Sequence, residues 1–317
     1  EAAELALRWR PTGVLHLARD DTQAATQRRV VEAQQPEADD FCFVDRRQAA
    51  QLAGWPVSGG GWWFAGGGWV APASLCRANL ARHPDLIRSH YGCDVARIDR
   101  SAGLWRAYDS AAQVVAEAPI LVLANAGDTK RFALAEHLPL RAARGQVSHL
   151  PAAAGSPPDV VVCRSGYVTP AIDGVRCVGA TFSVDDGELG LRLADTVENL
   201  VKLDFILPGH GGGLSAAALG GRVGFRPLAP DRLPMIGAVG DAAAIDPEHP
   251  ARRLAEVPRV PGLYLNNGFG ARGIVWSALA GELLACLISG EAPPLPDDLV
   301  DAVDPGRFLL RGRQGRL

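Results

Sequence analysis

The sequence predicts a mixed α/β fold, and three observations lead to this prediction. Residues 263–267 form a short apolar strand that runs into a glycine motif at 268–273 and then into a helical stretch at 274–289. Residues 120–126 are a continuous apolar run, which is typical of a buried parallel strand, and they end at a glycine turn. Residues 139–182 are rich in short strands. Parallel strands and helices beside an antiparallel region indicate a mixed α/β fold.

The first 90 residues are expected to alternate strands and helices. Two glycine clusters bracket Trp62, Trp63 and Phe64, and they predict a hairpin or loop with aromatic sides. The other elements expected here are a strand at 14–18, a helix from Asp21 to about Gln34, the start of a helix at 45–47, and a helix at 73–82 opened by Pro72.

The middle of the chain predicts antiparallel strands followed by a helix. Strands are expected at 94–99, 104–109 and 113–117, and a helix is expected from Leu193 to about Leu207. A glycine loop at 209–213 follows this helix. Its His210 has no partner at metal-ligand spacing, so we expect it to be exposed to solvent.

Composition excludes several classes of protein. With 48% hydrophobic residues in 317, the chain can bury a core, and its net charge of −3 gives no general attraction to nucleic acid. The apolar run at 274–289 is short and contains Glu282, so we expect no membrane span and a cytoplasmic location. The six cysteines lack a C-x-x-C pair, so we expect no metal site and interpret them as small core residues.

The basic residues are unusual because all of the 32 except Lys130 and Lys202 are arginines. Either guanidinium groups recognise phosphate or carboxylate here, or the bias reflects codon usage. The C-terminal tail carries four arginines without an acid, and it is either a phosphate-binding patch or a solvated end: Arg307, Arg311, Arg313 and Arg316.

The glycine motif at 268–273 follows a strand and opens a helix, as in G-x-G-x-x-G dinucleotide sites. Such sites need a second strand that ends in an acid, but prolines follow Glu291, so no ribose-binding strand can form there. What remains is a helix N-terminus, with its partial positive charge, aimed at an electron-rich group. The alternative is a glycine turn in an unrelated α/β protein.

Several segments in a fixed order resemble the FAD-dependent D-amino-acid-oxidase-like family, from about residue 40 to the end. In particular they resemble the oxidase part of bifunctional tRNA-modifying members. The segments begin at Gly67, Arg144, Gly166, Asp231, Gly268 and Gly290. The resemblance implies a FAD-binding domain of this family, interleaved with an antiparallel-sheet substrate domain. It also implies that FAD is the cofactor.

The resemblance implies four parts: a substrate-domain portion at 1–65, FAD-domain elements at 66–138, a substrate-binding domain at 139–225, and a FAD-contacting segment with the tail at 226–317. Family members begin with a βαβ unit that binds the FAD pyrophosphate, and no such segment precedes Val14. We therefore expect a fold that lacks its first βαβ unit, with weak FAD binding by this chain alone. A methyltransferase domain is expected in the full-length protein.

The resemblance implies oxidative removal of the carboxymethyl group from carboxymethylaminomethyl(-2-thio)uridine at the tRNA wobble position, giving aminomethyl-uridine and glyoxylate. No catalytic base is needed, so the residues implied here bind ligands. Arg226, Tyr167 and Arg144 are the expected substrate-binding residues. The expected cofactor-binding residues are Val95, Ala124, Gly127, Gly268, Phe269, Gly270, Ala271, Arg272, Gly273 and Ile274. Arg272 could instead pair with Glu282. The alternatives are an oxidase of glycine, sarcosine or a D-amino acid, and a fragment without FAD.

Overall fold

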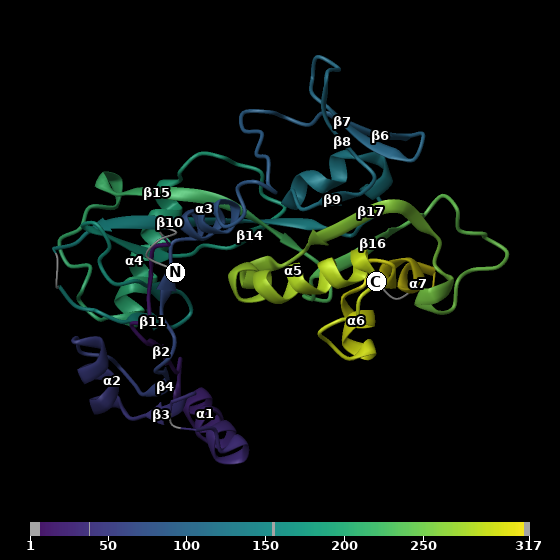
Figure 1. The fold of residues 1–317 in the computed structure, drawn as a ribbon. Helices are drawn as coiled ribbons and strands as arrows, with labels where there is room; N and C mark the ends of the chain where they lie inside the picture. The colour runs from purple at the N-terminus through teal and green to yellow at the C-terminus, as the bar shows by residue number, and fades with distance from the viewer. Residues whose placement is uncertain (1–6, 38, 154–155, 314–317) are drawn as a thin grey trace. The chain divides into compact units, whose positions relative to one another are not determined.

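The computed structural model of the chain describes residues 7–37, 39–153 and 156–313, with side chains up to residue 310 (Figure 1). The chain divides into two units. Unit 1 comprises Glu1–Arg88, Arg144–Ser183 and Glu188–Gly224, and unit 2 comprises Ser89–Ala143, Val184–Gly187 and Phe225–Leu317. The four-part division of the chain, with the role assigned to each part, remains a prediction.

Unit 1 is built on a mixed sheet. Among the described residues, the strand order is β14-β10-β13-β12-β11-β2-β4-β3, and β15 also pairs with β10. The pair β2–β11 is parallel, whereas β2–β4, β3–β4, β11–β12, β12–β13 and β10–β13 are antiparallel. The strands of this sheet are β2 (Val14–Leu17), β3 (Cys42–Val44), β4 (Gly61–Phe64), β10 (Arg141–Pro151), β11 (Val161–Cys163), β12 (Tyr167–Val168), β13 (Val175–Gly179), β14 (Ser183–Val184) and β15 (Gly220–Leu228).

Two helices of unit 1 begin at residues whose side chains cap them. Asp20 caps α1 (Asp21–Gln34), and Asp45 and Gln48 form a capping box on α2 (Arg46–Ala53), which ends at Gly54 with φ +62°. Pro72 opens α3 (Pro72–Ala81). The helix α4 (Leu193–Ile206) and α2 supply Leu203, Ile206, Ala49 and Ala53 to a core with Leu15, Leu17, Val162, Val168 and Val178. These helices confirm the sequence prediction.

The hairpin predicted around Trp62 is wrong. The strand β4 pairs with β2 and β3, whereas β5 (Trp69–Val70) pairs with β1 (Trp9–Arg10). The expected exposure of His210 is also wrong. Its Nε2 lies 2.8 Å from the Pro157 carbonyl oxygen, and its ring contacts Trp55 at a centroid distance of 4.7 Å.

The cysteines were expected in the core, and the structure corrects this for several of them. Cys286 is buried, Cys42, Cys163 and Cys177 are partly buried, and Cys76 and Cys93 are exposed. Arg307 also departs from the expected tail patch, because it is 4% exposed and its guanidinium pairs with Asp231. The side chains of Arg311 and Arg313, and all of Arg316, lie outside the described residues.

Unit 2 contains two three-stranded sheets among its described residues. The first is the antiparallel series predicted from the sequence: β6 (Arg97–Ser101), β7 (Leu104–Tyr108) and β8 (Val114–Ala118). The second has the order β16-β17-β9, with β16 (Met235–Gly240), β17 (Arg259–Asn267) and β9 (Leu121–Leu123). β9 is parallel to β17, as expected, but it is an edge strand, with Val122 38% exposed. It leads into 3-10 turns and not an α-helix (Ala126–Arg131, Ala133–Ala135).

Three helices complete unit 2: α5 (Gly273–Ser289), α6 (Asp297–Val303) and α7 (Arg307–Arg313). Ala280, Leu283 and Leu284 of α5 pack against Ile236 and Val303. By length and composition, Gly270–Ser289 would suffice to cross a membrane, a criterion that core helices of soluble proteins also meet. The absence of a membrane span remains a prediction. Short 3-10 turns lie at Ala216–Ala218 in unit 1 and at Leu254–Glu256 and Gly270–Arg272 in unit 2.

Candidate cofactor and substrate site

The glycine motif forms the turn that the sequence predicts. The strand β17 ends at Asn267, a 3-10 turn follows, and α5 runs to Ser289. Gly268 and Gly270 have φ values of +77° and +56°, which L-residues with a side chain rarely adopt. A Cβ on Gly270 would also meet Leu228 at 3.0 Å. The glycines are therefore required by the backbone path itself.

The N-terminus of α5 is open. Within the described residues no side chain caps it, and Ile274 and Val275 in the first turn are 49% and 85% exposed. This end of the helix carries the partial positive charge of the helix dipole, and no described side chain neutralises it there. Arg272, directly before the helix, is exposed, and no bond to Glu282 joins these two described side chains.

Two segments predicted to bind the cofactor lie at one edge of the sheet. The strands β9 and β17 are parallel neighbours in which Leu123 is opposite Leu265, so their carboxyl ends meet. Ala124 and Gly127 follow β9, and the glycine turn follows β17. In open α/β sheets, ligands bind outside the carboxyl ends of the strands. The structure thus brings Ala124, Gly127 and residues 268–274 together.

Asn267 joins these two segments, and the sequence analysis assigned it no role. Its side chain is buried, and its Nδ2 donates to the Ala126 carbonyl oxygen at 2.9 Å and to the Thr129 hydroxyl at 2.8 Å. Its Oδ1 accepts from the Gly268 N–H at 2.7 Å. The signal that could have revealed it is an asparagine between an apolar strand and a glycine that needs an αL conformation.

Val95 is connected to the same edge through its neighbour. Asp94 accepts two hydrogen bonds from Arg131, at 2.8 and 3.1 Å, and Arg131 closes the 3-10 turn that contains Gly127. The Arg131 guanidinium holds the pKa of the Asp94 carboxyl below its usual range, through these hydrogen bonds and its charge. Val95 itself packs against the hydrophobic core of unit 2.

Arg226 is a partly buried arginine of β15, and it lies in the part of this strand that belongs to unit 2. Its Nη1 is buried and has no hydrogen-bond partner, and no described carboxylate forms an ion pair with it. A buried donor without a partner costs about 1–3 kcal/mol, and more when it is charged. Arg226 is therefore ready to bind an anionic or carbonyl oxygen supplied by a ligand.

Arg144, in contrast, is engaged within its own unit, and its expected role toward a substrate stays a prediction. It is fully buried, and every nitrogen of its guanidinium has a partner inside unit 1. Nη1 pairs with Asp195, Nε donates to the Glu188 carbonyl oxygen at 2.7 Å, and Nη2 donates to the Gly190 carbonyl oxygen at 2.7 Å. These partners come from a segment more than 40 residues further along the chain, and they fix the guanidinium inside unit 1.

Tyr167, the third residue expected to bind substrate, lies in β12 of unit 1 and is partly buried. The sheet fixes its backbone on both sides, opposite Cys163 in β11 and Gly179 in β13. Its position on the sheet is therefore set by strand pairing, and its role toward a substrate stays a prediction.

Comparison with known proteins gives a family match over most of the chain. The DAO family model, described as FAD dependent oxidoreductase, matches residues 1–287. The chain is 58% identical over 313 residues to the tRNA 5-methylaminomethyl-2-thiouridine biosynthesis bifunctional protein MnmC of Aromatoleum aromaticum, covering 99% of this chain and 49% of that protein. It is 51% identical to the protein of the same name from Azoarcus sp., covering 98% and 48%. The chain thus spans about half the length of these relatives.

Solved structures share the fold at lower identity. Glycine oxidase from Geobacillus kaustophilus has a TM-score of 0.75 at 18% identity, covering 96% of this chain and 79% of that one. Iminodiacetate oxidase from Chelativorans sp. has a TM-score of 0.72 at 23% identity, with the same two coverages. These matches confirm the predicted mixed α/β fold.

Proposed function

The chain belongs to the DAO family of FAD-dependent oxidoreductases, and from this premise we propose that it oxidises a secondary amine on the wobble uridine of tRNA. The reaction converts carboxymethylaminomethyl(-2-thio)uridine and water to aminomethyl-uridine and glyoxylate, with the loss of two electrons and two protons. The names of the bifunctional relatives support a tRNA substrate. The amino-acid oxidases are similar in fold only, so they give less support to the alternative of a free amino acid.

The fit of the family's cofactor rests on the turn at the carboxyl ends of β9 and β17. Ala124, Gly127, Ala271 and Arg272 are exposed there, and the N-terminus of α5, which no described side chain caps, provides positive partial charge for an electron-rich ring. When bound, FAD supplies the acceptor for the two electrons removed from the substrate. The residues of the chain hold it and favour negative charge that develops beside the helix N-terminus.

The observation that carries the substrate proposal is the buried, unpartnered Nη1 of Arg226. The substrate carries a carboxylate on the carbon that is oxidised, and a guanidinium can bind both oxygens of a carboxylate. Holding the carboxylate fixes the adjacent C–N bond for oxidation to an imine, which water then splits into the amine and glyoxylate. We keep Tyr167 of unit 1 as a separate substrate-binding candidate. Positioning is the main contribution of these residues.

Replacing the guanidinium of Arg226 by an ammonium group tests the proposal that Arg226 binds the substrate carboxylate. Loss of a bidentate contact costs about 1.5–3 kcal/mol, so Arg226→Lys should lower kcat/KM by about one to two orders of magnitude. Arg222→Lys, at an exposed position of the same strand, is the matched control and should leave kcat/KM unchanged. Turnover is compared on tRNA that bears carboxymethylaminomethyl-uridine, on glycine and on sarcosine. Faster turnover of the free amino acids would support the alternative substrate class and refute the tRNA proposal.

A second variant tests the cofactor site without disturbing the turn. Gly273 has a helical φ, and a Cβ there would meet only Phe269 at 3.7 Å, an ordinary contact. Gly273→Ala should therefore fold normally but weaken FAD binding, because its methyl group would crowd the helix N-terminus that would hold the cofactor. The control is Gly281→Ala in the same helix, where a Cβ meets nothing within 4 Å. Equal FAD affinity of both variants would contradict the proposed site.

The longer relatives bear the word bifunctional in their names, and this supports a second activity in the other half of such proteins. We assign that half to the methyltransferase domain expected from the sequence. A tRNA substrate also favours the cytoplasm as the location of the reaction.

A further inference from the structure

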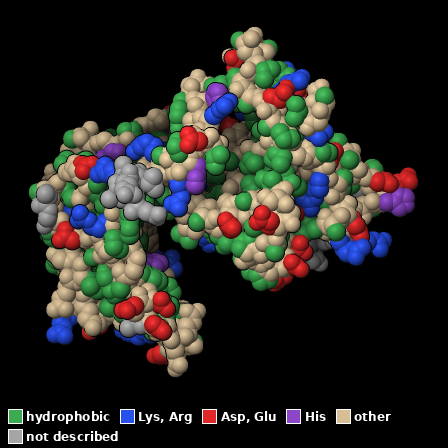
Figure 2. Space-filling model, viewed as in Figure 1, with side chains coloured by type: hydrophobic (Ala, Val, Ile, Leu, Met, Phe, Trp, Pro, Cys, Tyr) green, Lys and Arg blue, Asp and Glu red, His purple; other side chains and the backbone are tan. Residues whose placement is uncertain are grey.

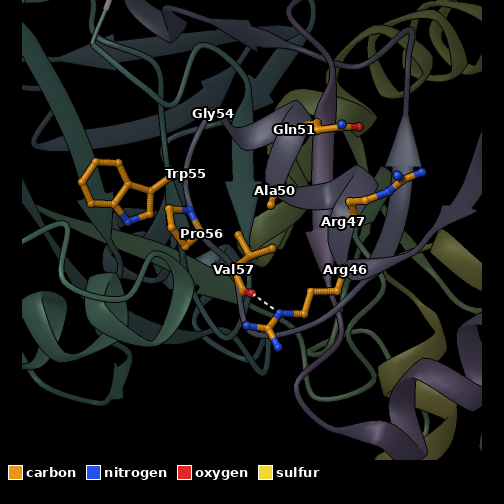
Figure 3. Close-up of a pocket in the computed structure, with 8 residues that line it drawn as sticks. All are labelled: Arg46, Arg47, Ala50, Gln51, Gly54, Trp55, Pro56 and Val57. Atoms are coloured by element: carbon orange, nitrogen blue, oxygen red, sulfur yellow. Dashed lines mark hydrogen bonds between the residues drawn. The ribbon is translucent and has the colours of Figure 1, made fainter.

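Unit 1 contains a cavity of about 640 Å³ that the proposed oxidation does not use (Figure 3). Its walls are α2 and the loop that follows this helix. The polar lining is Arg46, Arg47 and Gln51, and the apolar lining includes Trp55, Pro56 and Val57. In Figure 3 the Trp55 ring lies on the left, Arg47 extends outward on the right, and the Arg46 guanidinium lies beneath Val57.

The cavity has fixed walls. Gly54 ends α2 in a left-handed conformation, so the chain turns back along the helix, and Val57 anchors this return in the core. The indole N–H of Trp55 donates to the Pro208 carbonyl oxygen at 3.0 Å, and its ring contacts His210. A ligand would therefore meet an aromatic surface that is already in place, with little ordering cost on binding.

The two arginines of the cavity have guanidinium N–H groups that make no hydrogen bond among the described residues. Arg46 donates from Nε to the Val57 carbonyl oxygen at 2.9 Å, which orients its guanidinium, while Nη1 and Nη2 have no hydrogen-bond partner among the described residues. The same holds for the side chains of Arg47 and Gln51, and no described Asp or Glu lines the cavity. Figure 2 shows acidic and basic side chains mixed over the visible face of the molecule, and the net charge is −3. Attraction of an anionic ligand to this cavity would therefore depend on its own arginines and not on the charge of the whole protein.

These features match the chemistry of a nucleotide. An oriented guanidinium with two free N–H groups fits phosphate oxygens, and Arg47 offers a second cation for a neighbouring phosphate. A tryptophan beside a proline gives an apolar surface on which an unstacked base can lie. The cavity is widely open to solvent, and its volume of about 640 Å³ is larger than one phosphate requires.

We propose that this cavity is a docking site for a single-stranded nucleotide of an RNA, with phosphates on Arg46 and Arg47 and a base on the Trp55 side. This inference rests on the proposed tRNA substrate and adds a contact outside the cofactor unit. An acidic peptide would use the same arginines but would gain less from the aromatic wall, so the observations favour RNA.

The test measures tRNA binding by the purified protein as a function of salt. The double variant Arg46→Ala/Arg47→Ala should weaken binding about 10- to 100-fold and lower the slope of log K against log salt by about 1.5, since each lost phosphate contact contributes about 0.7–0.9. Because Arg47 makes no hydrogen bond within the described residues, Arg47→Ala alone should keep the fold and give about half the slope change. Arg77→Ala, an exposed arginine of α3, is the control and should change neither quantity.

Stacking is tested with a short single-stranded oligonucleotide. Trp55→Ala should weaken its binding about 5- to 100-fold, whereas Trp55→Phe, which keeps an aromatic ring, should bind nearly as the parent does. Unchanged tRNA affinity and salt slope in the arginine variants would overturn the inference, while tRNA binding by the parent would leave the proposed function intact. A parent that binds no tRNA would overturn both. Loss of binding to an acidic peptide, with RNA binding unchanged, would assign the cavity to a protein partner instead.

Discussion

Replacing Asn267 by alanine should remove the hydrogen bonds that join the turn after β9 to the glycine turn after β17. The side chain is 2% exposed and makes three hydrogen bonds, to the Ala126 carbonyl oxygen, the Thr129 hydroxyl and the Gly268 N–H. Alanine cannot replace any of them. The Thr129 hydroxyl keeps its bond to Asn125, so two backbone groups, the Ala126 carbonyl and the Gly268 N–H, lose their side-chain partner.

The expected loss of stability follows from these two groups. An unsatisfied buried polar group costs about 1–3 kcal/mol, so two groups near the lower half of that range amount to about 3 kcal/mol. This loss corresponds to a decrease in Tm of about 6–12 °C, at about 2–4 °C per kcal/mol for a domain of 150–250 residues. Urea unfolding without FAD measures the free energy, and hydrogen exchange of the Gly268 amide reports the lost bond directly.

The neighbouring residue provides the control. Asn266 has a buried Oδ1 without a hydrogen-bond partner among the described residues, so Asn266→Ala removes an acceptor that was already unsatisfied. We expect a change of less than about 1 kcal/mol for this variant. If Asn267→Ala were no more destabilising than Asn266→Ala, or if exchange at Gly268 were unchanged, the reasoning that Asn267 connects the two segments would be refuted.

Three further predictions follow from buried groups. Asp195→Ala leaves its buried arginine partner unpaired and should cost about 3–5 kcal/mol in denaturant unfolding; a loss below 1 kcal/mol would contradict this. Burial raises the pKa of the Cys163 thiol to about 11, so iodoacetamide at pH 8 should alkylate exposed Cys76 and leave Cys163 unmodified in peptide mass spectra. Burial lowers the pKa of His16 below its usual value of about 6.5. Its contribution to stability is present above that pH and is lost as the pH falls through the folded value, so His16→Gln should flatten urea-measured stability between pH 7 and 5.

The sequence predicted those parts of the fold that depend on local signals. The strand, glycine turn and helix that end at Ser289 were predicted because Gly268 and Gly270 are needed for the backbone path and the apolar run continues as a helix. The hairpin at Trp62 was not predicted correctly, because the partners of β4 are β2 and β3, and each is separated from β4 by at least one helix. Strand pairing between distant segments has no local signal, even where the strand itself is recognised.

The candidate site shows the same division. The glycine residues could be located from the sequence, because their spacing carries the geometry. The role of Asn267 could not be read there, since its partners, at 126 and 129, are contributed by a turn about 140 residues earlier. The pairing of β9 with β17 could therefore be seen only in the structure, whereas the glycine turn after β17 could be predicted from the motif.

The arginines show most clearly why residue type alone cannot assign a site. Arg144 and Arg307 are buried and paired with the carboxylates of Asp195 and Asp231, so their charges are neutralised within the protein. Arg226 keeps a buried Nη1 without a partner. When a protein buries a guanidinium nitrogen without an acceptor, the nitrogen loses its hydrogen bonds to water and gains none in return, which costs free energy. A bound carboxylate would supply that acceptor, and this is the physical reason for proposing substrate recognition by Arg226 before the other two.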